Sequence, residues 1–130
     1  MTEISFNDPN LLELPRLSPI LEYLYCYRCT GLQRLPQLPP TLEELDCYRC
    51  TSLQTLPILP ITLKRIDCIL CTALVSLPEL PLTLEWLDCW ECTTLVSLPQ
   101  LFHTALERLH CSDCTSLISL PPLPPTLERL

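Results

Sequence analysis

A leucine returns along this chain at an almost fixed spacing, and this period constrains the fold more than any other feature. These leucines are Leu21, Leu42, Leu63, Leu84, Leu106 and Leu127. The spacing is constant except for one extra residue, which falls in the segment LFHTAL at 101–106; we call the repeat that contains it the lengthened turn. A short fixed period of about 21 residues is the signature of a solenoid, in which no unit buries its apolar face alone and stacked neighbours supply the core.

One unit, TLEELDCYRCTSLQTLPILPI at 41–61, shows the internal pattern. Counted from its leucine as position 1, apolar residues stand at positions 1, 4, 6, 9 and 12, namely Leu42, Leu45, Cys47, Cys50 and Leu53. Side chains alternate along a strand, so positions 4 and 6 point inward together. The tail LPILP fixes φ twice and removes two backbone donors, which favours an extended return over a helix. We predict short parallel strands with a polyproline-like convex side and little or no helix.

The length of 130 residues indicates a single domain. Residues 14–130 are predicted to form the solenoid, with about five full repeats and a C-terminal partial repeat, and residues 1–13 an N-terminal cap or lead-in. The segment NDPNLLELP is expected to start with one helical turn capped by Asp8, with Pro9 at its first position. The last residues, TLERL, are expected to begin a sixth strand. Its unprotected edge favours self-association, so a homo-oligomer is expected.

The segment LPELPLTLEWLD at 77–88 resembles the short bacterial-type leucine-rich repeats of type III secreted effectors, whose units run L-P-x-L-P-x-x-L-x-x-L-x-V-x-x-N. The resemblance covers roughly residues 14–130 and implies a leucine-rich-repeat solenoid. The ubiquitin-ligase domain that some such effectors carry is not expected in this chain. Cysteine replaces the Val of that pattern at Cys26, Cys47, Cys68, Cys89 and Cys111, and its Asn at Cys29, Cys50, Cys71, Cys92 and Cys114. In its cysteines the chain is similar to small repeat proteins of giant DNA viruses of amoebae, which implies a viral or virion-associated protein.

Several interpretations of the ten cysteines stay open at this stage. Buried thiols behave as small hydrophobes with a weak donor, so two stacked ladders of free, inert cysteine account for every one of them. A disulfide between equivalent residues of adjacent strands would be strained, whereas one within a Cys-x-x-Cys pair would be less so. The spacing C-x2-C-x17-C-x2-C also falls within that of zinc ribbons, although the first cysteine of each pair sits on a predicted strand. A zinc, iron–sulfur, redox or disulfide-stabilised structural protein is therefore the alternative.

The outward positions of each predicted strand carry residues that the core does not need. Every Tyr and Trp of the chain stands at position 3, 5 or 7 of its repeat. Aromatic side chains without a core role are the usual anchors of protein interfaces, although they could instead only cover the edges of the ladder. The like-charge Asp row, treated as exposed carboxylates, also leaves a calcium site as an alternative. The predicted partner-binding residues on the concave face are Tyr23, Tyr25, Tyr27, Asp46, Tyr48, Asp67, Ile69, Trp86, Asp88 and Trp90.

Charge and composition exclude several other functions. The net charge is −7, and only 8 scattered Lys and Arg residues are present, which opposes binding to nucleic acid or to anionic membranes. No signal peptide and no apolar stretch of membrane-spanning length is recognisable, so an intracellular protein, in a host cytoplasm or a virion, is expected. His103 and His110 have no patterned nucleophile or acid around them, and Gly31 is the only glycine, so no phosphate loop exists. We predict a non-enzymatic protein-interaction or assembly module with no cofactor and no metal.

Overall fold

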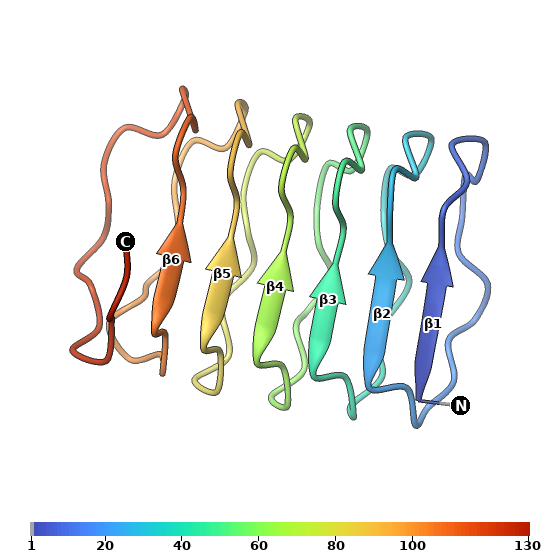
Figure 1. The fold of residues 1–130 in the computed structure, drawn as a ribbon, viewed down its shortest axis with the longest axis horizontal. Helices are drawn as coiled ribbons and strands as arrows, with labels where there is room; N and C mark the ends of the chain where they lie inside the picture. The colour runs from blue at the N-terminus through green and yellow to red at the C-terminus, as the bar shows by residue number, and fades with distance from the viewer. Residues whose placement is uncertain (1) are drawn as a thin grey trace.

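The computed structural model describes residues 2–130 and arranges them as a parallel β-solenoid. Six strands pair in chain order in one sheet: β1 (Glu3–Phe6), β2 (Tyr23–Cys26), β3 (Glu44–Asp46), β4 (Arg65–Asp67), β5 (Trp86–Asp88) and β6 (Arg108–His110). Each strand is followed by an extended return segment, and the two termini lie at opposite ends of the row (Figure 1). Within residues 2–130 there is no helix, and hence none that could cross a membrane. The predicted fold class is confirmed.

The first strand lies inside the stretch predicted as a lead-in. β1 pairs in parallel with β2, with Ile4 opposite Leu24 and Phe6 opposite Cys26. Ile4 and Phe6 pack against the core, so residues 2–13 extend the solenoid by one turn instead of capping it with a helix. The expected helical turn at Asp8 is a hydrogen-bonded turn, in which the Leu11 amide donates to the Asp8 carbonyl at 3.2 Å. The Asp8 side chain does accept a hydrogen bond, from the Asn10 amide at 2.9 Å.

The opposite end of the chain forms less strand than predicted. In the segment TLERL the only pairing is an isolated bridge between Arg108 and Arg129. The expected sixth strand at this end is therefore reduced to one bridge, and the sixth strand of the sheet is β1.

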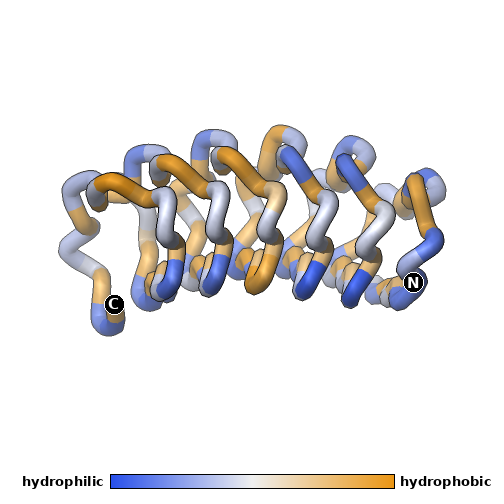
Figure 2. Tube along the Cα trace, turned by 90° about the horizontal axis from the view of Figure 1, so that it is seen from above, coloured by the Kyte–Doolittle hydropathy of each residue, from blue (hydrophilic) through white to orange (hydrophobic). Residues whose placement is uncertain are grey.

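The core is a stack of leucines that repeats the sequence pattern turn by turn. Leucines at positions 1, 4 and 12 of a repeat are almost completely buried, for example Leu42, Leu45 and Leu53 at 0% exposure. The leucines between the prolines close the core from behind and are also buried, as in Leu56 and Leu59. Figure 2 shows that apolar and polar segments recur once per turn along the trace. Truncating one such leucine to Ala typically costs about 2–5 kcal/mol of unfolding free energy.

The cysteines form part of this core, as the first interpretation predicted. Nine of them are buried and Cys111 is partly exposed, and all ten are free thiols. The thiol at position 9 donates to the backbone carbonyl of the position-6 cysteine one repeat earlier. The Sγ to oxygen distances are 3.0 Å for Cys50 to Cys26, 3.1 Å for Cys71 to Cys47, 3.0 Å for Cys92 to Cys68 and 2.9 Å for Cys114 to Cys89. The thiols thus satisfy buried carbonyls, which otherwise cost free energy when left unpaired.

A second ladder is made by the threonine that precedes the position-1 leucine in four repeats, namely Thr41, Thr62, Thr83 and Thr126. Thr62 Oγ1 donates to the carbonyl of Leu42 at 2.7 Å, and Thr83 repeats the contact to Leu63 at 2.9 Å. The lengthened turn interrupts this ladder. There Ala105 holds the threonine position, and the buried Thr104 donates instead to the carbonyl of Leu101 within its own turn.

Each repeat also bends through a left-handed residue that is not glycine. The residue before the second cysteine has a positive φ in five repeats: 54° at Arg28, 59° at Arg49, 60° at Leu70, 55° at Glu91 and 61° at Asp113. An L-residue in this region costs roughly 1–2 kcal/mol. The stack offsets that cost because the same residue hydrogen-bonds to its neighbouring turn, as the Arg49 amide does to the Ile69 carbonyl at 2.9 Å. The bend turns the second cysteine back into the core.

Thiol accessibility tests the buried-cysteine core. In the native chain one thiol, Cys111, should react rapidly with Ellman's reagent, and ten should react after unfolding without reductant. Burial blocks the reagent and raises the pKa of buried thiols such as Cys26 and Cys71, and the thiolate is the reacting form. Absorbance of the released chromophore gives both counts.

The Cys111→Ser variant serves as the matched control. It should lose the rapid reaction of the native chain and keep the reaction of the other nine thiols after unfolding. Fewer than ten thiols in the unfolded, unreduced chain would support the disulfide interpretation. Stoichiometric zinc or iron in elemental analysis of the native protein would support the metal interpretation.

Candidate functional site

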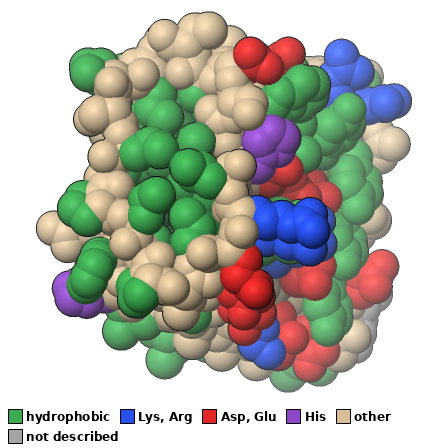
Figure 3. All heavy atoms as spheres, turned by 60° about the vertical axis from the view of Figure 1, so that its left-hand side comes forward, with side chains coloured by type: hydrophobic (Ala, Val, Ile, Leu, Met, Phe, Trp, Pro, Cys, Tyr) green, Lys and Arg blue, Asp and Glu red, His purple; other side chains and the backbone are tan. Residues whose placement is uncertain are grey.

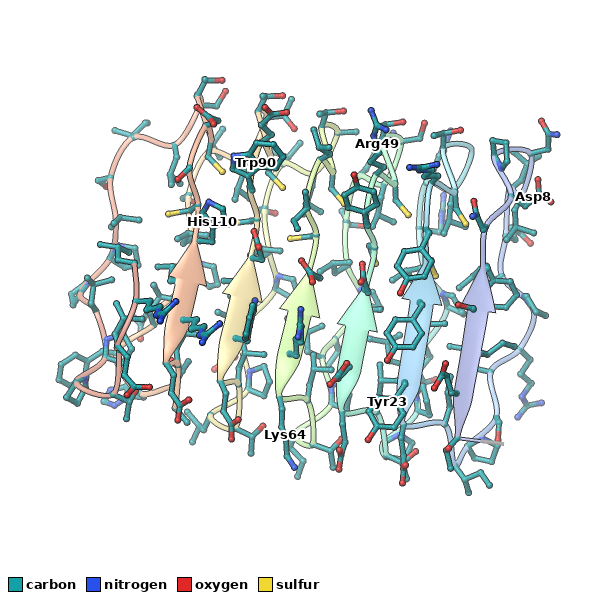
Figure 4. All side chains as sticks on the ribbon, viewed as in Figure 1. Asp8, Tyr23, Arg49, Lys64, Trp90 and His110 are labelled. Atoms are coloured by element: carbon teal, nitrogen blue, oxygen red, sulfur yellow. The ribbon has the colours of Figure 1, made fainter. Side chains whose placement is uncertain are left out.

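The outward side chains of the strands form one continuous surface, which we call the strand face. It comprises positions 3, 5 and 7 of each repeat from β2 to β6, and it carries all four Tyr and both Trp residues. Figure 4 shows Tyr23 near the start of β2, Trp90 beyond the end of β5 and His110 at the end of β6. Each of the ten predicted partner-binding residues is in these rows, and all are half-buried except Asp67, which is buried.

The position-3 row contains a stack of cations on an aromatic ring. The register places Arg65, Trp86 and Arg108 side by side on β4, β5 and β6. The guanidinium carbon of Arg65 lies 4.1 Å from the Trp86 ring centroid, and that of Arg108 lies 4.5 Å from it. Such cation–π contacts contribute about 0.5–1 kcal/mol each at exposed sites. Trp86 is therefore held by its own neighbours, a role that the sequence pattern did not reveal.

Other aromatic side chains of the strand face are also paired locally. The rings of Tyr25 and Tyr27 stack with centroids 5.8 Å apart and planes inclined by 8°. The Trp90 ring stacks on His110 with centroids 6.4 Å apart, and its Nε1 donates to Asp113 Oδ2 at 3.1 Å. Tyr48 lies between these groups in the position-7 row and is half-buried.

The aspartates at position 5 have a structural role that the sequence analysis missed. The Oδ1 atoms of Asp46 and Asp88 accept hydrogen bonds from the amides of Tyr48 at 2.9 Å and Trp90 at 3.1 Å. Asp67 differs, since Arg65 contacts its Oδ2 at 3.2 Å, while its buried Oδ1 has no hydrogen-bond partner within residues 2–130. Asp67 is only 7% exposed, so the expectation of an exposed carboxylate row is wrong.

This environment raises the pKa of several acidic groups. Burial, together with the nearby Asp67 and Glu44 carboxylates, raises the pKa of Asp46 to about 6, despite the opposing Tyr48 amide and Arg65. Burial raises the pKa of Asp67 as well, with Asp88 acting in the same direction and Arg65 opposing. Burial and the Glu44 carboxylate raise the pKa of Tyr25 to about 12. Burial is thus the main cause for all three groups, and neighbouring carboxylates add to it.

Within residues 2–130 no group of three or more His, Cys, Asp or Glu side chains is arranged to hold a metal. His110 Nδ1 lies 3.4 Å from Asp88 Oδ1, and His103 lies edge-on to Phe102 in the exposed part of the lengthened turn. Cys111, the position-6 cysteine that follows His110, belongs to the inward set of side chains on the other side of the sheet.

A pH series on Asp46 tests the electrostatics of this face. The pKa of Asp46 is higher in the folded chain than its unfolded value of about 3.9, so the folded state binds this proton more tightly. Stability from this group is therefore present at about pH 4 and is lost as pH rises through about 6. Asp46→Asn should raise the thermal midpoint at pH 7 and leave it almost unchanged at about pH 4, because the amide oxygen still accepts from Tyr48.

Circular dichroism melts across this pH range measure the difference between variant and wild type. The control is Glu79→Gln, which removes an exposed carboxylate from a return segment and serves as the baseline for the effect of Asp46→Asn. A midpoint that falls at pH 7 in Asp46→Asn would contradict the assignment.

Comparison with known proteins finds similarity to a solved structure. No protein-family model matches this chain, and no curated protein matches it in sequence. Among solved structures, the chain is similar to YopM from Yersinia enterocolitica WA-314, with a TM-score of 0.56 and 32% sequence identity. The match covers 92% of this chain and 30% of the YopM chain, so this chain spans less than a third of the length of that protein. The fold is thus a parallel β-solenoid of leucine-rich-repeat type with short regular turns, as in YopM.

Proposed function

We propose that the chain is a non-enzymatic protein-binding module that uses its strand face as the contact surface. The observation that carries this proposal is the distribution of its large aromatic side chains. All six Tyr and Trp residues lie on the strand face, while the core is filled by leucine and cysteine. Aromatic side chains dominate the binding energy of protein interfaces, and here the core makes no use of them.

The likeness to YopM supports a protein-interaction role in general terms, because solenoids of this type present extended surfaces to other proteins. The identity of the partner is not implied by that likeness. The strand face is the better candidate surface for a second reason. It combines aromatic, acidic and basic groups in fixed register, whereas the return side is mostly proline and aliphatic side chains.

Paired substitutions on the two sides of the solenoid test which surface binds. Tyr48→Ala combined with Trp90→Ala should reduce partner capture at least about tenfold, while costing less than about 1 kcal/mol of unfolding free energy. The matched control is Ile58→Ala with Ile61→Ala on the return side, where these side chains are 89% and 82% exposed. Immobilised wild type and both variants are exposed to extract of the source organism, and captured proteins are quantified by mass spectrometry.

A protein retained by wild type and by the Ile58/Ile61 variant, and lost by the Tyr48/Trp90 variant, supports the proposal. Loss on the Ile58/Ile61 variant alone would place the interface on the return side and contradict it. Thermal melts accompany each variant, because loss of binding together with a large loss of stability would show that Tyr48 and Trp90 are structural.

We also propose that copies of the chain associate through the end of the solenoid beyond β6. Figure 3 shows apolar side chains gathered inside the ring of the last turn. Among the apolar residues of this end, Leu120 is 39% and Leu130 is 68% exposed, and beyond β6 only one bridge is formed within residues 2–130. An apolar end next to a barely paired strand is a template for a second chain.

Light scattering at micromolar concentrations should give a dimer mass for the chain. Leu120→Glu with Leu130→Glu should shift that mass to a monomer, because the charges would be desolvated in the contact. A wild-type monomer at every concentration would overturn this part of the proposal.

The proposed setting is intracellular or within a virus particle. The free thiols suit a reducing compartment, and the similarity of the cysteine pattern to repeat proteins of giant viruses motivates the second option. The thiol count described above, repeated on protein from the native source, separates a reduced chain from an oxidised one.

A further inference from the structure

A pocket of about 250 Å³ opens on the strand face above β2, β3 and β4. Its walls come from Tyr25, Tyr27, Glu44, Leu45, Asp46 and Arg65. The two tyrosine rings are parallel to within 8°, and the Tyr25 hydroxyl donates to Glu44 Oε2 at 3.4 Å. The pocket is therefore lined by two tyrosines and two carboxylates, next to Leu45 and Arg65.

The two carboxylates of this pocket lack a cationic partner within residues 2–130. The three ion pairs of that range join Lys64 to Glu43 at 3.7 Å, Arg65 to Asp67 at 3.2 Å and His110 to Asp88 at 3.4 Å. Among the position-5 aspartates within residues 2–130, Asp67 contacts Arg65, Asp88 contacts His110, which is a cation only when protonated, and Asp46 contacts no basic side chain. The neighbouring Asp67 keeps a buried Oδ1 that accepts no hydrogen bond from the described residues.

Arg65 would be the natural counterion, yet its guanidinium is held elsewhere. The register places Arg65 directly beside Glu44 on the adjacent strand. Its guanidinium is nevertheless engaged by the Trp86 ring at 4.1 Å and by Asp67 at 3.2 Å. These two contacts leave Arg65 as one wall of the pocket, without a direct ion pair to Glu44 or Asp46 within residues 2–130.

The contacts of Arg65 also show which side chain an aromatic ring and a carboxylate can bind together. An aromatic ring and a carboxylate together hold one guanidinium. The pocket offers the same groups nearer β2, with the Tyr25 and Tyr27 rings in place of Trp86 and with Asp46 and Glu44 in place of Asp67. We propose that this pocket binds the guanidinium of an arginine side chain presented by the protein partner. This inference rests on the proposed protein-binding function of the strand face.

Arginine fits this pocket better than lysine for geometric reasons. A guanidinium is planar, stacks on aromatic rings and donates two parallel hydrogen bonds to carboxylates, whereas an ammonium is a compact, strongly hydrated point charge. The net charge of −7 attracts cationic groups in general and adds no preference between the two. The selectivity must therefore come from the stacked rings and the paired carboxylates.

Burial is the main cause of the raised pKa values in this pocket, and the neighbouring carboxylates add to it. Asp46, with a pKa raised to about 6, faces Glu44 on its own strand and Arg65 and Asp67 on β4, while its charge acts on Tyr27 next to β2. Tyr25, with a pKa raised to about 12, faces Glu44 and Glu3. A bound guanidinium would stabilise the ionised carboxylates and lower the pKa of Asp46.

The test is an NMR titration of the full chain with three small probes that differ only in the head group. N-acetyl-arginine methylamide should give saturable shifts of the Tyr25 and Tyr27 ring signals, with a Kd on the order of 10 mM for a single side chain. The lysine analogue should bind several-fold more weakly. The neutral citrulline analogue, which keeps the shape without the charge, should give no saturable shift.

Two variants and one matched control locate the binding. Asp46→Asn and Glu44→Gln should each weaken the arginine probe by about tenfold or more at pH 7. Asp88→Asn removes a carboxylate of the same row outside the pocket and should leave the Kd unchanged. In wild type, the carboxyl pKa of Asp46, followed by its carbon shift, should fall when the arginine probe is present.

The outcomes separate this inference from the proposed function. Equal binding of arginine and citrulline, equal binding of arginine and lysine, or equal weakening by Asp88→Asn each overturns the arginine pocket. If the Tyr48/Trp90 variant loses its partner while the arginine probe gives no saturable shift, the strand face still binds a protein and only the pocket assignment fails. An intact amide spectrum in each variant confirms that the fold is retained.

Discussion

Every feature of this molecule depends on the stacking of each residue on its equivalent one turn away. One turn of the chain brings equivalent backbone groups to the strand spacing of about 4.8 Å, so each position of the repeat becomes a row. Inward rows must then be apolar or able to satisfy the backbone, because water has no access to them. Outward rows place side chains in contact with the corresponding side chains of the neighbouring turns.

The cysteine rows illustrate how this constraint selects a side chain. The side chain at position 9 must fit into a space next to the leucines, and it must also donate a hydrogen bond to a backbone carbonyl of the preceding turn. Asparagine meets the second need in the repeats that the chain resembles, and in this chain the thiols of Cys50, Cys71, Cys92 and Cys114 meet it. A thiol is a weaker donor than an amide, but it carries only one polar group into the core. The Cys-x-x-Cys spacing follows from this geometry, with one cysteine on the strand and one after the left-handed bend.

The repeat period made most of the fold predictable. The predictions that were wrong concern segments in which the repeat is irregular. β1 was missed because Phe6 occupies the slot held by cysteine in the later turns, and because its register with β2 is one residue shorter than the regular repeat. The alternation of Ile4 and Phe6 was the available signal. The left-handed bends could not be predicted from the sequence, since Arg28, Arg49 and Leu70 are not residues that favour positive φ. Tertiary hydrogen bonding fixed their conformation.

The rows of the strand face were predictable in the same way, whereas the contacts between rows were not. Position alone placed Trp86, Asp67 and Asp46 outward. It could not show that Arg65 and Arg108 enclose Trp86, or that Asp67 is nearly buried, because these depend on side-chain conformation across adjacent strands.

A regular solenoid that repeats the same outward residue in every turn would have no distinct site, so specificity must come from departures from the repeat. The aspartate row is the clearest case, since three equivalent carboxylates have three different surroundings. Asp88 faces His110, Asp67 faces Arg65, and Asp46 faces Glu44 and the tyrosines. The choice of Arg65 at position 3, one turn after Glu44 and one turn before Trp86, creates this difference. Because the guanidinium of Arg65 contacts Trp86 and Asp67, the pocket on the side of Glu44 and Asp46 keeps a net negative charge.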